Sequence, residues 1–156
     1  MKPTTTDKDG HLRLQDQVCF SLYSASRMVT KAHGLLLKEL GVTYPQYLAL
    51  LMLWEQDGIL VSEIASALEI DAGTATPLMQ RLEKLGLVER VRCDRDERRV
   101  RVYLTALGKA SYDKALSVPD GLGEAMGLDP ENARGLLAEM QMIKAQITKW
   151  LDPEQT

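Results

Sequence analysis

The stretch that decides the fold spans residues 62–104, SEIASALEIDAGTATPLMQRLEKLGLVERVRCDRDERRVRVYL. Its first segment, Ser62–Leu68, has the apolar spacing of a short helix. Asp71 then offers the side-chain oxygen of an N-cap, and residues 72–85 repeat apolar side chains every three or four positions until Gly86. We therefore expect a short helix, a turn and a longer amphipathic helix.

A two-stranded hairpin is predicted directly after the second of these helices. Residues 87–92 and 100–104 alternate apolar with charged or polar side chains, and the tip between them, residues 94–98, is entirely polar. A short helix, a turn, an amphipathic helix and a basic hairpin follow one another in a winged helix-turn-helix. The predicted fold class is mainly α with a small β-hairpin wing.

The predicted helix over residues 72–85 has one face for packing and one for contact. At 100° per residue the apolar positions fall together, at Ala75, Leu78, Met79, Leu82 and Leu85. A B-DNA major groove admits one such helix, and an arginine on the hairpin can enter the narrow minor groove beside it. The predicted DNA contacts are Thr74, Thr76, Pro77, Gln80, Arg81 and Lys84 on the helix and Arg95, Asp96 and Arg98 on the hairpin.

Charge is distributed as a compact DNA-binding protein would distribute it. The chain has 156 residues and a net charge of −3, yet residues 81–101 hold eight Lys or Arg against five Asp or Glu. Phosphate contacts need local positive charge only. The alternative at this point is a solvated, charged hairpin with no role in nucleic-acid binding.

Helical segments flank the central stretch. Residues 12–40 predict a long helix that ends at Gly41, and a capping box over residues 43–46 opens a second, buried helix that reaches Trp54. A further helix is expected from Ala106. We expect a loop or broken helix over residues 117–127, because they include one proline and three glycines, and a last helix from Asp129–Pro130 to Trp150.

Membrane association and secretion are not expected. The longest unbroken apolar run, Leu48–Trp54, is far shorter than the ~20 residues of a bilayer-spanning helix, and residues 1–10 lack the apolar region of a signal peptide. Two cysteines, Cys19 and Cys93, make neither a disulfide scaffold nor a zinc site. We expect a cytoplasmic protein without a metal or cofactor.

The two cysteines differ in their predicted settings. Cys19 lies in the first turns of its predicted helix, where the helix dipole favours a thiolate. The alternative is a small buried apolar residue, the common fate of a lone cysteine. Cys93 lies at the hairpin, where we expect it to be exposed and without a role.

Three segments resemble a known family. DQVCFSLYSASR at residues 16–27, TYPQY at 43–47 and DER at 96–98 are similar to the organic-hydroperoxide-sensing OhrR branch of the MarR family, over roughly residues 12–108. The resemblance implies that Cys19 is the sensing thiol and Tyr23 one of its hydroxyl partners. It also implies one domain over residues 1–156, in which 41–105 form the DNA-binding lobe and 12–40 and 106–151 form the helices of a homodimer.

The sequence departs from that family at one position of interest. His33 stands where the family has its second tyrosine partner. Since it follows Cys19 by fourteen residues, the two lie about 21 Å apart along one helix, and a contact requires the other subunit. The alternative for His33 is a half-exposed interface histidine with no redox role.

These features predict a homodimeric repressor that binds pseudo-palindromic operator DNA. An organic hydroperoxide would release it by oxidising Cys19 to a sulfenic acid, which a low-molecular-weight thiol or another reversible product would then cap. A second hypothesis is a MarR-type repressor released by a small phenolic or carboxylate ligand, with Cys19 merely structural. A thiol peroxidase is disfavoured because no resolving cysteine is present, and we expect no enzymatic activity.

Overall fold

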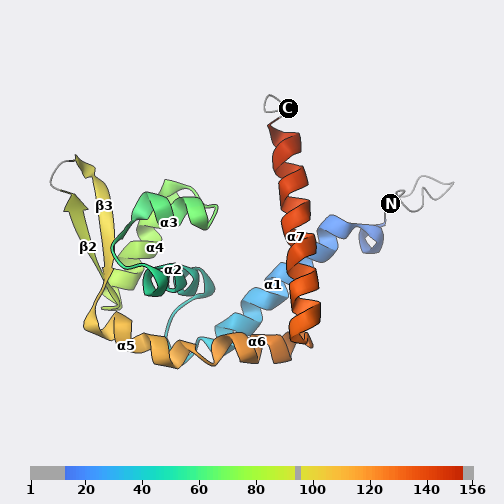
Figure 1. The fold of residues 1–156 in the computed structure, drawn as a ribbon, viewed down its shortest axis with the longest axis horizontal. Coiled ribbons are helices and arrows are strands. Elements are labelled where there is room, and N and C mark those ends of the chain that lie inside the picture. The colour runs from blue at the N-terminus through green and yellow to red at the C-terminus, as the bar shows by residue number, and fades with distance from the viewer. Residues whose placement is uncertain (1–12, 94–95, 153–156) are drawn as a thin grey trace.

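The computed structural model describes residues 13–93 and 96–152, with Glu97 and Arg98 described by their backbone only. A lobe of short helices and a small sheet lies at one end, two helices lead away from it, and a long last helix stands at the far end (Figure 1). The accessible surface is 12196 Å². A compact monomer of 17.4 kDa exposes only about 7,900 Å², so the chain is extended and leaves large surfaces uncovered.

Three helices build the lobe, namely α2 (Tyr44–Glu55), α3 (Val61–Ala67) and α4 (Ala72–Lys84). The predicted capping box of α2 is present: the Thr43 backbone N–H donates to Gln46 Oε1 at 2.8 Å. Buried side chains from all three helices form the core, among them Leu50, Leu53, Ile64, Met79 and Leu82. These helices and their order are as the sequence predicted, within one residue at each end of α3 and α4.

Three antiparallel strands form the sheet, in the order β1 (Ile59–Leu60), β3 (Asp96–Leu104) and β2 (Val88–Cys93). Val102 of β3 lies opposite Ile59 on one side and Arg90 on the other, and it is fully buried. The hairpin was predicted, but β1 was not. The predicted polar tip over residues 94–98 was too long, because β3 already begins at Asp96.

The first long helix is shorter than expected. It consists of a short 3₁₀ turn, η1 (Leu14–Asp16), and helix α1 (Val18–Leu36), in place of one helix over residues 12–40. Gln17 has extended backbone angles and separates the two. At the other end, the chain leaves the helix in a series of turns that close at Gly41, where φ is +67°.

Two helices, α5 (Ala106–Ala115) and α6 (Val118–Met126), lead away from the lobe. Helix α6 occupies the region that we expected to be a loop or broken helix, so that expectation was wrong. Its Pro119 stands in the first turn, where no backbone donor is lost, and Gly127 ends it in the left-handed region. Gly121 permits close packing, since a Cβ there would lie 2.8 Å from a methyl carbon of Leu36 on α1.

The last helix, α7 (Pro130–Leu151), buries none of its side chains within the chain. It stands apart from the lobe at the end of α6 (Figure 1). Its exposed large apolar residues are Leu136, Leu137, Met142, Ile147, Trp150 and Leu151. No helix in the described parts of the chain is long and apolar enough to cross a membrane.

Candidate DNA interface and thiol site

Helix α4 begins with a strong N-cap. One Asp71 carboxylate oxygen accepts from the Thr74 backbone N–H at 2.9 Å, and the other accepts from the Thr74 hydroxyl at 2.9 Å. The Thr74 hydroxyl bond, followed by its backbone N–H, lowers the pKa of Asp71 below its usual 3.8. Thr74, a predicted DNA contact, therefore uses its hydroxyl proton to hold the helix start.

The outer face of α4 carries the side chains that we proposed to meet DNA. Ala75, Leu78, Met79 and Leu82 are buried as predicted, whereas Leu85, expected on the packed face, is 44% exposed. Leu85 is the C-cap residue, beyond the last turn that the lobe covers. The exposed residues of the helix include all six predicted contacts, Thr74, Thr76, Pro77, Gln80, Arg81 and Lys84.

A bond network fastens α4 to the wing. Glu83 near the end of α4 accepts from the Arg90 backbone N–H at 3.1 Å and from its guanidinium at 2.9 Å. The Arg90 hydrogen bond lowers the pKa of Glu83. Because Arg90 lies on β2, these bonds hold α4 and the hairpin in one relative orientation.

The described part of the wing adds basic side chains at its edge. Asp96 begins β3 opposite Cys93, while Arg95 lies outside the described residues and Arg98 is described by its β3 backbone only. Arg92 and Arg99 are exposed on the same hairpin. Both residues were counted in the basic segment over residues 81–101 but were not predicted to contact DNA. Their exposure on the wing makes them further candidates for phosphate contacts.

The thiol of Cys19 is exposed at the start of α1, as its second residue. Within the single chain, Cys19 is therefore not a buried apolar residue. Tyr23 lies one turn further along the same face and is 58% exposed. The Arg27 guanidinium donates to the Tyr23 hydroxyl at 3.0 Å and lies 5.6 Å from the centre of its ring. Cys93, expected to be exposed, is half-buried.

His33 lies apart from Cys19 within the chain, near the other end of α1. It is 4% exposed, so the alternative of a half-exposed interface histidine is wrong in its exposure. Its ring stacks on Tyr44 of α2 with centroids 3.9 Å apart, and Tyr47 lies beside it at 6.1 Å. The Nδ1 atom donates to the Val29 carbonyl at 3.0 Å, which leaves Nε2 for any other partner. Burial raises the pKa of Tyr47, and the nearby Tyr44 raises it further.

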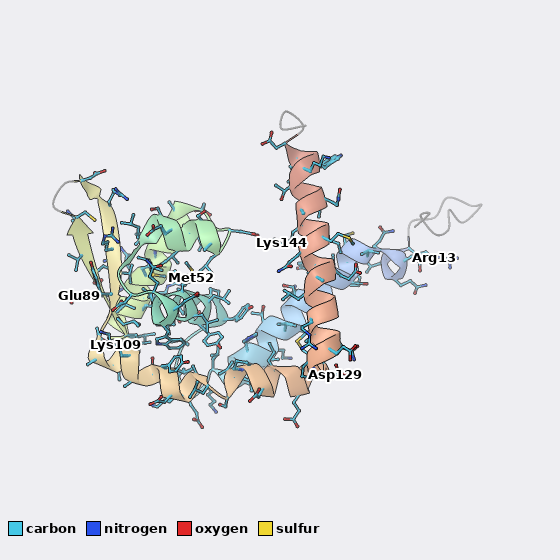
Figure 2. The ribbon with its side chains drawn as sticks, viewed as in Figure 1. Arg13, Met52, Glu89, Lys109, Asp129 and Lys144 are labelled. Carbon is cyan, nitrogen blue, oxygen red and sulfur yellow. The ribbon has the colours of Figure 1, made fainter. Side chains whose placement is uncertain are left out.

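An open hollow of about 470 Å³ lies where α2, α5 and β3 meet. Trp54 and Tyr112 line it in an edge-to-face pair, and Lys109 lies at its rim, 3.7 Å from Asp57. Figure 2 places Lys109 at the base of the lobe. The hollow therefore combines two aromatic rings with one ammonium group. Among the described residues, no cluster of His, Cys, Asp and Glu is placed to hold a metal ion.

Comparison with known proteins agrees with this geometry. Residues 42–100, which span α2 to the wing, match the model of the MarR family. The organic hydroperoxide resistance transcriptional regulator of Bacillus subtilis is 42% identical over 83% of this chain and 86% of its own length. The chain belongs to the MarR family. Like the relatives it matches, this MarR-family protein is a transcriptional regulator and not an enzyme.

Solved structures share the whole fold. AbfR of Staphylococcus epidermidis, in an overoxidised form bound to DNA, superposes with a TM-score of 0.72 at 30% identity, over 90% of this chain and 99% of AbfR. Reduced AbfR bound to DNA superposes with a TM-score of 0.71 at 31% identity, over 86% and 94% of the two chains. The mainly helical architecture with its small sheet is therefore the MarR winged-helix fold.

Proposed function

We propose that this MarR-family regulator is a homodimeric repressor in the cytoplasm that leaves its operator when an organic hydroperoxide oxidises Cys19. The observation that carries the proposal is the exposed Cys19 thiol in the first turn of α1, one turn before an exposed tyrosine. Similarity to the organic hydroperoxide resistance regulator supports the class of oxidant.

Dimerisation is proposed from the surfaces that the chain leaves uncovered. Helix α7 has 22 residues and no buried side chain, so burial within its own chain does not stabilise it, and α1 buries only His33. Large apolar side chains on both helices are exposed, including Val18 and Met28 on α1 and Ile147 and Trp150 on α7. A second copy, packed across a two-fold axis, would cover them.

The proposed DNA complex follows from that symmetry. Two α4 helices related by a two-fold axis enter successive major grooves on one face of the duplex, so half-site centres lie about one turn, ~10 bp, apart. Thr76, Gln80 and Arg81 would contact base edges or phosphates, and Arg98 would enter the minor groove. A footprint that covers a single half-site would contradict this arrangement.

The proposed chemistry is a two-electron oxidation of sulfur. The Cys19 thiolate attacks the terminal oxygen of the hydroperoxide, and an S–O bond forms as the O–O bond breaks. The hydroperoxide proton stays on the transferred oxygen, and the alkoxide that leaves takes a proton from water to become the alcohol. The product is a sulfenic acid, which a low-molecular-weight thiol can convert to a mixed disulfide with loss of water. The Tyr23 hydroxyl, one turn along the same face of α1, would donate a hydrogen bond to the attacking sulfur.

A comparison of two cysteine variants tests the proposal. Purified wild-type, Cys19→Ser and Cys93→Ser proteins are bound to the operator and treated with cumene hydroperoxide in a gel-shift assay. We expect all three to bind, wild type and Cys93→Ser to dissociate, and Cys19→Ser to stay bound, because a hydroxyl fills the same space and is not oxidised. Intact-mass measurement of the released protein checks for one added oxygen.

The second hypothesis gives a different result. If Cys19→Ser dissociates with wild-type peroxide sensitivity, the redox mechanism is wrong. A ligand-released repressor would then be supported if a small phenolic or carboxylic acid releases both wild type and Cys19→Ser from DNA. Lys109→Met, beside the hollow, should abolish that release. Catalytic consumption of hydroperoxide by the protein with a thiol reductant would instead support a peroxidase.

A further inference from the structure

The turn between α3 and α4 contains an unusual backbone conformation. Glu69 has φ of +55°, and it is the one non-glycine residue with positive φ among the described residues. This left-handed conformation is costly for a side chain with a Cβ. Glu69 lies two residues before Asp71, the N-cap of α4, so its conformation directs the chain into this helix, the proposed recognition helix for DNA.

The Glu69 side chain joins this turn to the far end of the molecule. Its carboxylate forms an ion pair with the ammonium of Lys144 on α7, across 75 positions of sequence. Figure 2 shows Lys144 on the side of α7 that faces the lobe.

We propose that Glu69 and Lys144 are positioning residues for DNA binding, which hold the start of the recognition helix at a set place relative to the dimer helices. This inference rests on the proposed function, because it needs a dimer whose two α4 helices must match the spacing of two grooves. The pair touches no base in this proposal and acts through the position of α4.

The exposure of the pair decides what kind of effect to expect. The Lys144 and Glu69 side chains are 63% and 64% exposed, and such pairs add little to folding stability. A pair that selects one lobe position can still change operator affinity without changing the unfolding midpoint. Because the pair is exposed, salt screens it, and its effect on operator affinity should fall as ionic strength rises above about 0.1 M, where the Debye length is ~10 Å.

A charge swap tests the pair. Operator affinity is measured at low salt for wild type, Lys144→Glu, Glu69→Lys and the double variant. We expect Lys144→Glu to weaken operator binding by about two- to five-fold. The double variant, which exchanges the two charges, should recover the affinity that Lys144→Glu loses. The cycle cancels the general effect of added positive charge on DNA affinity. Lys144→Arg should bind as wild type, and Lys149→Glu, elsewhere on α7, is the matched control.

A second measurement needs neither DNA nor peroxide. Amide hydrogen exchange of residues 66–74 is compared by mass spectrometry, and we expect it to accelerate in Lys144→Gln but not in Lys149→Gln. Strictly additive effects in the cycle, with unchanged exchange, would overturn the inference. A coupled pair in a protein that hydroperoxide fails to release would instead overturn the proposed redox function and leave the positioning role intact.

Discussion

The ring of His33 stacks on the ring of Tyr44 at a centroid distance of 3.9 Å and an interplanar angle of 30°. This contact joins the end of α1 to the start of α2, where the proposed dimer helix meets the DNA-binding lobe. A movement of α1 would therefore be transmitted to α2, and so to the lobe, through this contact. The proposal that His33 also faces Cys19 of the partner subunit assigns that contact to Nε2.

Replacement of His33 by Phe separates the stacking role from a redox role. Phenylalanine keeps an aromatic ring against Tyr44, so we expect the protein to remain folded and bound to operator. Peroxide-driven release should become slower, because phenylalanine has no ring nitrogen to contact Cys19 of the partner subunit. Stopped-flow measurement of the release rate checks this. A wild-type release rate in His33→Phe would restrict His33 to packing.

Base-edge contacts are expected on the outer face of α4. Thr76→Ala and Gln80→Ala should reduce discrimination between operator and random DNA by about 1–3 kcal/mol for a good base contact, with little loss on random DNA. Titrations of both DNA types by fluorescence anisotropy check this. Equal losses on both would place these side chains on phosphates.

The wing arginine is expected to act in the minor groove. Arg98→Ala should weaken operator binding by roughly 1–3 kcal/mol and leave the unfolding midpoint unchanged. Lys149→Ala on α7 is the control for a lost surface charge. Operator affinity at physiological salt equal to that of wild type would contradict the assignment.

The recognition-helix cap makes stability depend on pH. Hydrogen bonds from Thr74 lower the pKa of Asp71 below 3.8 in the folded state. The stabilisation is present above the unfolded value and is lost as pH falls through the lower, folded value. Urea unfolding at pH 5 and near pH 3 should show a smaller loss for Asp71→Asn, since asparagine also caps helices but does not titrate. An unchanged loss would mean that other carboxylates dominate.

Two helical glycines should respond oppositely to alanine. A Cβ at Gly108 would lie 2.0 Å from the Leu87 carbonyl oxygen, whereas a Cβ at Gly135 meets nothing within 4 Å. We expect Gly108→Ala to lower the free energy of unfolding by about 1–3 kcal/mol and Gly135→Ala to raise it by about 0.5–1 kcal/mol. Chemical denaturation at one protein concentration compares them. Equal effects would contradict the close approach of α5 to Leu87.

Local signals accounted for most of the lobe. The capping box of α2, the cap at Asp71 and the alternation in the hairpin are each complete within a few residues, so sequence was sufficient to predict them. Strand β1 has two residues and exists because Ile59 pairs with Val102, a contact that local sequence does not encode. Helix α6 was missed because its glycines weaken an isolated helix, whereas in the fold one of them, Gly121, permits close packing against Leu36 of α1.

Sequence placed the candidate thiol but not its surroundings. The register of Cys19 with Tyr23 follows from helix geometry, whereas the sequence left both an exposed and a buried Cys19 open. The burial of His33 depends on Tyr44 arriving from α2, and the Glu69–Lys144 pair depends on how α5 and α6 carry α7 past the lobe. Such contacts join residues far apart in sequence, which periodicity cannot detect.

Because α7 buries no side chain within its own chain, the stability of the C-terminal region should depend on protein concentration. In the proposed homodimer, α7 is stabilised by the second copy, so each tenfold rise in protein concentration adds about 1.4 kcal/mol to the apparent stability of the dimer. Newly made chains at low abundance would be exposed to proteases at this end. A cell could therefore clear the regulator by slowing its synthesis, without any oxidant.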